Sequence, residues 1–298
     1  MPCYKPLKAW RSSDGSVFFN RKDSPRPNPS EINLACGQCV GCRLERSRQW
    51  AVRCIHEAKC WKQNCFVTLT YDDEHLPEHG NLVYRDFQLF MKKLRRRYHD
   101  GIRFFMCGEY GEQDSRPHFH ACLFNFDFPL KYRWKTRNGV SVLYRSDALD
   151  ELWGKGFASV GEVTFESAAY VARYVMKKVT GDAAEAHYTR LDPETGELYC
   201  LTPEFTHMSL KPGIGAWWFQ RFYRDVAVDG TVIARGKKAV APRFYMRRLK
   251  HYDPENYEAI AALREEYGAL TEADSTPERL AVRETVAVAR LNLVRRSL

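Results

Sequence analysis

The sequence lacks the long apolar stretches that mark membrane-spanning and exported proteins. Its mean hydropathy is −0.51, and no uncharged apolar run approaches the roughly 20 residues that a helix needs to cross a bilayer. The first ten residues also lack the apolar core of a signal peptide. We therefore expect a cytosolic protein, in which thiols stay reduced and disulfides are rare. We see no internal repeat.

Acidic residues are the minority among the charged ones. There are 46 Lys and Arg against 37 Asp and Glu in 298 residues, which gives a net charge of +9, and 13% of the residues are aromatic. Positive charge among Trp, Tyr and Phe suits phosphate contacts and base stacking, although a generic basic surface remains the alternative. The basic stretches are residues 43–62, 92–97 and an aromatic loop at 131–145.

The hydrophobic pattern predicts an α+β fold, with a central antiparallel sheet flanked by helices. We expect strands at residues 65–71, 103–109, 118–126 and 157–164. Helices are expected at 43–61, 84–98, 147–153, 168–178, 217–224, 257–268 and 277–294. Residues 1–35 and 131–145 are expected to be irregular, and 180–205 to form a loop or hairpin.

A His-x-His pair stands on one predicted strand. His118 and His120 are two residues apart, so both imidazoles project from the same face and can hold one divalent ion. Glu109 ends the preceding strand and can face the pair if the two strands form a hairpin. Glu112 is the alternative carboxylate. A polar outer face of an edge strand would give the same pattern.

Two tyrosines lie one helical turn apart on the helix predicted at 168–178. Tyr170 and Tyr174 therefore share one face, and Lys177 follows nearby. A phenol is a poor nucleophile at its ordinary pKa, but an adjacent cation or metal makes its attack on phosphate feasible. Packing in the core is the competing interpretation of both tyrosines.

Together these motifs resemble those of the HUH endonucleases, which nick single-stranded DNA through a phosphotyrosine. The resemblance rests on residues 66–71, 108–111 with 116–120, and 170–178. The cysteine motif at 36–42 and residues 48–53 and 56–57 add to it. Within that family, the replication initiators of gokushoviruses, a group of microviruses, are the most similar. The resemblance implies a ferredoxin- or RRM-like sheet and a divalent metal, Mg²⁺ or Mn²⁺, at His118, His120 and Glu109.

The resemblance further implies rolling-circle initiation at the single-stranded phage origin, in the host bacterial cytoplasm. Tyr170 or Tyr174 would attack the phosphate with help from Lys177. No Gly-x4-Gly-Lys-Ser/Thr loop occurs, so strand separation is expected from a host helicase and replication machinery. The alternatives are a non-catalytic nucleic-acid-binding protein with an RRM-like sheet and zinc module, or a plasmid-type relaxase.

Three cysteines within seven residues form a compact cluster. Cys36, Cys39 and Cys42 can share one structural zinc with a distant fourth ligand, for which Cys3 is the first candidate and Cys54 the second. Free buried thiols are the alternative. The predicted organisation is a Cys-rich segment with a basic helix at 1–62, an endonuclease core at 63–180, and an extension of unclear role at 181–298.

Overall fold

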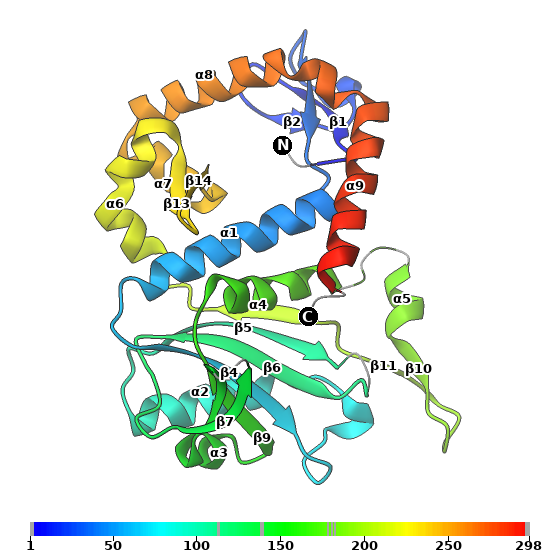
Figure 1. The fold of residues 1–298 in the computed structure, drawn as a ribbon. Helices are drawn as coiled ribbons and strands as arrows, with labels where there is room; N and C mark the ends of the chain where they lie inside the picture. Colours follow the sequence, from blue (N-terminus) through cyan, green and yellow to red (C-terminus); the bar gives the residue numbers. More distant parts are fainter. Residues whose placement is uncertain are drawn as a thin grey trace. The chain divides into compact units, whose positions relative to one another are not determined.

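The computed structural model describes residues 3–111, 114–137, 140–177, 179, 181 and 183–295. Contacts divide the chain into two units, residues 1–46 with 261–298 and residues 47–260. Figure 1 labels the elements along the chain. Among the described residues, no helix combines the length and the apolar character needed to cross a bilayer.

A seven-stranded antiparallel sheet organises residues 47–260. Its strand order is β12-β5-β6-β4-β9-β8-β7. The strands are β4 (Asn64–Tyr71), β5 (Arg103–Tyr110), β6 (Pro117–Phe124), β7 (Tyr132–Arg137), β8 (Val140–Arg145), β9 (Gly156–Gly161) and β12 (Phe205–Met208). The central order β5-β6-β4-β9 is that of a ferredoxin-like fold, as the resemblance to the HUH endonucleases implied.

Helices cover both faces of this sheet because its strands are apolar on both faces. On one face, α2 (Tyr84–Arg97) and α3 (Asp147–Trp153) pack on alternate residues of β4 and β6, such as Val67, Leu69 and Phe119. On the other face, α1 (Val40–Ala58) and α4 (Phe165–Lys177) pack against Phe105 and Cys122. The predicted α+β architecture is confirmed.

A third apolar cluster lies on the other side of α1. It joins Val52 to α6 (Ala216–Asp229), α7 (Arg243–Tyr252) and the hairpin of β13 (Thr231–Ala234) and β14 (Lys237–Val240). Ala51 and Cys54 of the same helix face the sheet. Helix α1 is thus buried on two sides, which explains its several apolar positions.

The remaining elements are shorter or peripheral. Residues 1–46 contain a three-stranded sheet of β1 (Leu7–Arg11), β2 (Val17–Phe18) and β3 (Ser30–Leu34). The helices α8 (Pro254–Leu270) and α9 (Pro277–Arg295) match the two that the sequence predicts near the C-terminus. The others are α5 (Ala183–Tyr188), β10 (Thr189–Leu191), β11 (Leu198–Cys200), and the 3₁₀ turns Arg21–Asp23, Glu78–Gly80 and Glu272–Ser275.

The structure corrects two expectations of irregular backbone. Residues 1–35 contain the β1–β3 sheet, and residues 132–137 and 140–145 form the paired strands of the β7–β8 hairpin. In the first case, proline and serine between the strands obscured the short alternating segments. In the second, the basic side chains masked a strand whose residues 132–135 are exposed. The helix α7 was also missed.

Candidate functional site

Glu109, His118 and His120 come together on the sheet face that α4 covers. In the β5–β6 hairpin, Glu109 lies directly opposite His118 in register. The Nε2 atoms of His118 and His120 lie 2.9 Å and 2.8 Å from the same Oε1 atom of Glu109. The geometry is therefore that of one carboxylate oxygen shared by two imidazoles.

The other ring nitrogen of each histidine is held in place by a neighbouring oxygen. His118 Nδ1 lies 2.9 Å from the carbonyl oxygen of Arg116, and His120 Nδ1 lies 2.9 Å from Thr68 Oγ1 on β4. Such partners orient the imidazole and fix its tautomer in metal sites. Both Nε2 atoms are consequently directed toward Glu109.

The site is buried, and the two histidines stabilise the negative charge of Glu109. Glu109 is 1% exposed and His120 is 7% exposed. Burial by itself would raise the pKa of Glu109, but hydrogen bonds from His118 and His120 outweigh it and lower that pKa to about 2. Glu109 is thus ionised at neutral pH, as a metal ligand must be.

Tyr170 brings a phenol to the same place. Its Oη lies 3.4 Å from Glu109 Oε1, and its ring meets His120 edge to face with centroids 5.0 Å apart. Its side chain is 37% exposed, whereas Ala168, Val171 and Ala172 of the same helix are buried. Tyr170 therefore lies at the rim of the core and reaches the histidine site.

Some predicted residues lie outside this description. The backbone of Tyr174 and Lys177 belongs to α4, but their side chains lie outside the described residues, as does Glu112 altogether. Thr68 is a site residue that sequence reasoning missed. The alternation of residues 66–71 was its signal, because it places Thr68 on the face opposite to the buried Val67 and Leu69.

The donor atoms suit a hard divalent cation. Two imidazole nitrogens and one carboxylate oxygen come within 4.8 Å of one another, a mixed N and O set compatible with Mn²⁺ or Mg²⁺. The described residues contain a second group of this kind, formed by Cys3, Cys36, Cys39 and Cys42. The described part of the chain thus contains two candidate metal sites.

Comparison with known proteins identifies a family model and several relatives that this chain resembles. The model of the family described as replication-associated protein ORF2/G2P matches residues 64–179. Replication-associated protein VP4 of Bdellovibrio phage phiMH2K is 32% identical over 94% of this chain and 87% of its own length. Replication-associated protein ORF2 of Spiroplasma virus 4 is 36% identical over 84% of this chain and 81% of its own length.

A third relative, replication-associated protein ORF4 of Chlamydia phage 1, is 30% identical over 76% of this chain and 58% of its own length. No solved structure matches this chain. The similarity to the first two relatives extends well beyond the matched family segment, across most of both chains. This chain belongs to the replication-associated protein family of these bacterial viruses.

Proposed function

We propose that this chain initiates rolling-circle replication by nicking and rejoining single-stranded phage origin DNA through a 5′-phosphotyrosine. The observation that carries the proposal is the convergence of Glu109, His118, His120 and the Tyr170 hydroxyl on one point. A nucleophile beside a three-donor metal site is the arrangement that metal-assisted phosphoryl transfer needs.

The two histidines and Glu109 fit a divalent ion. Mg²⁺ or Mn²⁺ bound there would polarise the scissile phosphate and neutralise its charge. Thr68 and the Arg116 carbonyl hold the two imidazoles in the orientation that leaves Nε2 available. The proposal assigns Mg²⁺ or Mn²⁺ to the site of Glu109, His118 and His120. It does not involve the four clustered cysteines.

We assign the nucleophilic role to Tyr170, whose hydroxyl lies 3.4 Å from Glu109 Oε1. Its phenol oxygen gives up its proton and forms a bond to phosphorus, the bond from phosphorus to the 3′ oxygen breaks, and that oxygen takes up a proton to become a 3′-hydroxyl. One phosphate ester replaces another, so rejoining needs no ATP. Tyr174, one turn further along α4, would serve the second cut, and Lys177 would assist by neutralising phosphate charge.

The β7–β8 hairpin supplies a surface for the DNA strand. Tyr132 and Trp134 are exposed on β7, and Arg145 lies over the Trp134 ring at 5.6 Å. Exposed aromatic rings among cations bind single strands by stacking and phosphate contacts. We propose that a host helicase opens the duplex, and that the reaction takes place in the host bacterial cytoplasm.

The test compares cleavage with binding. Full-length protein is incubated with end-labelled single-stranded origin DNA and Mn²⁺, and products are resolved on denaturing gels. We expect His118→Ala and His120→Ala to abolish cleavage while most DNA affinity remains, because the basic surface is unchanged. His251→Ala, on an exposed position of α7, is the matched control and should cleave normally.

Two outcomes would contradict the proposal. Undiminished nicking by His118→Ala or His120→Ala would contradict the assignment of these histidines as metal ligands. Metal-independent binding by the unaltered protein, with no cleavage of any origin strand, would favour the non-catalytic nucleic-acid-binding alternative. Cleavage of a plasmid transfer origin in preference to phage DNA would favour the relaxase.

A further inference from the structure

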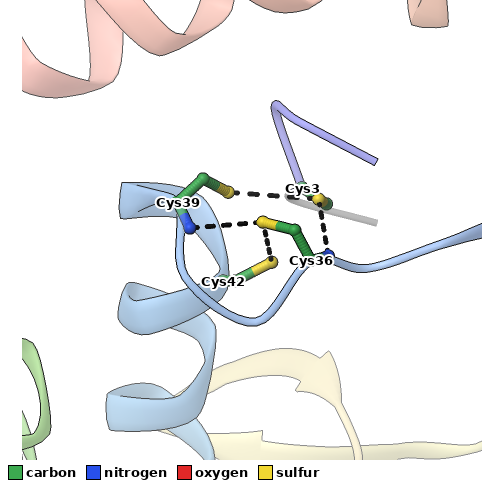
Figure 2. A group of neighbouring side chains, drawn as sticks. All are labelled: Cys3, Cys36, Cys39 and Cys42. Carbon is green, nitrogen blue, oxygen red and sulfur yellow. Dashed lines mark hydrogen bonds between the residues drawn. The ribbon is translucent and has the colours of Figure 1, made fainter. Parts of the chain in front are cut away.

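Four cysteines from two separate parts of the sequence converge around one point. Figure 2 shows Cys3 beside Cys36, Cys39 and Cys42, at the beginning of α1. The Sγ atoms of Cys36 and Cys42 are 4.0 Å apart, as are those of Cys39 and Cys3. All four sulfurs lie within 4.8 Å of one another.

These separations match a tetrahedral metal site and not disulfides. A disulfide requires sulfurs about 2.05 Å apart, and all four cysteines are free thiols. Four sulfurs at about 2.3 Å from a central Zn²⁺ would be separated by roughly 3.8 Å along each tetrahedral edge. The observed 4.0 Å separations are close to that value.

Backbone amides point toward the sulfurs. The N–H groups of Cys36, Tyr4 and Cys39 donate to the Sγ atoms of Cys3, Cys39 and Cys36, each at 3.3 Å. Hydrogen bonds of this kind favour the ionised form of an acceptor, and the thiolate is the form of cysteine that binds metal. The backbone is thus already folded around the sulfurs in a manner that suits metal-bound thiolates.

The surrounding segment has almost no hydrophobic core. Of residues 3–39, the buried ones are Cys3, Ala9, Ser12 and Cys39, so half of them belong to the cluster. A small sheet without a core generally requires disulfides or a structural metal to stay folded. Linking Cys3 to Cys36 would close the loop that contains β1, β2 and β3.

We propose that Cys3, Cys36, Cys39 and Cys42 bind one structural Zn²⁺, which joins the start of the chain to α1 and keeps the β1–β3 sheet folded. The site is closed, with four protein ligands and no position for substrate, as in structural zinc sites. It acts independently of the proposed nicking chemistry.

The first experiment measures metal content. Full-length protein is purified under reducing conditions, reconstituted with Zn²⁺, desalted and analysed for zinc and iron per chain. We expect about one zinc and negligible iron. Cys39→Ser should lose most of this zinc, whereas Cys200→Ser, at an exposed cysteine outside the cluster, should retain it. A wild-type protein with no zinc, or with iron in its place, would overturn the proposal.

The second experiment does not depend on a variant that folds. The wild-type protein is stripped with a chelator, resupplied with Mn²⁺ alone or with Mn²⁺ and Zn²⁺, and digested briefly with trypsin. Without zinc, cleavage after Lys8, Arg11, Arg21 and Lys22 should become about tenfold faster, because binding energy at such sites is folding energy. Equal cleavage rates with and without zinc would overturn the structural role.

The zinc proposal and the proposed function can fail separately. His118→Ala should lose Mn²⁺-dependent cleavage but still hold one zinc. Cys42→His, which keeps a zinc ligand at that position, should retain zinc and resistance to trypsin. Loss of zinc from His118→Ala would show that the metal belongs to the histidine site, and would contradict the cysteine assignment.

Discussion

Each histidine of the candidate metal site presents Nε2 to Glu109 because its Nδ1 already has an oxygen partner. For His118 this partner is a backbone carbonyl, which no substitution removes, but for His120 it is the hydroxyl of Thr68. Thr68 faces His120 directly in the β4–β6 register. The orientation of His120 therefore depends on a side chain of the neighbouring strand β4.

Thr68→Val removes that hydroxyl while keeping the branched shape. We expect it to weaken Mn²⁺ binding by about tenfold or more, as loss of such partners does in other metal sites. Calorimetric titration of Mn²⁺ measures the effect. Thr70→Val is the matched control, because Thr70 faces His118 in the same register. Equal affinity in the Thr68 variant would show that the ring is held in another way.

The tyrosines allow a test that separates chemistry from packing. Tyr→Phe removes one oxygen and little volume, so Tyr170→Phe and Tyr174→Phe should both fold. At least one should nick once, neither should complete repeated rounds of cutting and rejoining, and the double variant should form no covalent adduct. Denaturing gels with labelled origin DNA, followed by peptide mapping, provide the measurement.

Tyr267→Phe, at a position 69% exposed on α8, is the control and should react normally. An adduct that persists in the double variant would place the nucleophile elsewhere. If Tyr174→Phe alone removed all cleavage, the protein would be a one-tyrosine nickase, and Tyr170 would only pack against His120.

At the scale of elements, the basic segments differ in their relation to the site. Helix α2 packs on the sheet face opposite to Glu109 and the histidines, and Arg95 of its basic run donates to the carbonyl oxygen of Ile102. Arg97 pairs with Glu151 at 2.6 Å. Arg95 and Arg97 therefore have partners within the fold, whereas Lys92, Lys93 and Arg96 are exposed. The aromatic and basic side chains at 132–135 of β7 are exposed as well.

Substitution of Trp134 tests whether the exposed side chains of β7 bind single-stranded DNA. Base stacking on an exposed aromatic ring contributes about 1–3 kcal/mol, so Trp134→Ala should weaken single-stranded DNA binding by roughly tenfold. Fluorescence anisotropy at constant salt measures the affinity. Leu130→Ala, at a position 81% exposed just before the hairpin, should bind as the wild type does. An unchanged affinity in the Trp134 variant would show that Trp134 of the hairpin does not contact the DNA.

At the scale of residues 47–260, one buried ion pair connects three segments. Glu57 of α1 is fully buried and accepts hydrogen bonds from Arg103 Nε of β5 and from the Gly215 amide before α6, each at 2.6 Å. Arg103 also donates to the Pro212 carbonyl. A charge so deeply buried is tolerated because both oxygens of the Glu57 carboxylate accept hydrogen bonds.

Burial of His56 makes stability depend on pH. His56 is 1% exposed and stacks on Trp218, and its Nδ1 lies 3.1 Å from Tyr245 Oη. Burial, with a smaller contribution from Lys59, lowers the pKa of His56 to about 4, despite an opposing backbone hydrogen bond at Ile233. Below the unfolded-state pKa of about 6.5, the unfolded chain binds a proton that the folded chain rejects, so stability falls.

We expect a loss of about 2 kcal/mol between about pH 6.5 and pH 5 from this group. Urea unfolding of the wild type and His56→Gln across this range measures it, and the variant should show the shallower slope. His251→Gln, at an exposed position, should retain the wild-type slope. The Glu109 carboxylate, with a pKa of about 2 in the folded state, contributes mainly at lower pH. Parallel slopes for all three proteins would contradict the prediction.

The sequence alone predicted the four central strands, the flanking helices α1 to α4 and the pairing of His118 with His120 on one face. These features follow from local periodicity, because a strand alternates its faces every two residues and a helix repeats about every 3.6. The resemblance to microvirus replication initiators was confirmed by the relatives. The placement of Tyr174 and Lys177 in catalysis remains a prediction.

Only the tertiary structure could bring Thr68 to His120 and Glu57 to Arg103, and only it shows that Cys3, the fourth ligand that the sequence suggested, does lie beside Cys36, Cys39 and Cys42. Each of these contacts joins segments 33 or more residues apart, and local patterns carry no information on which distant strand or turn will lie alongside. The β1–β3 sheet and the β7–β8 hairpin escaped prediction for a related reason. Their strands bury little apolar surface, so the alternation that reveals a strand is weak there, and backbone pairing with a neighbouring strand decides the structure.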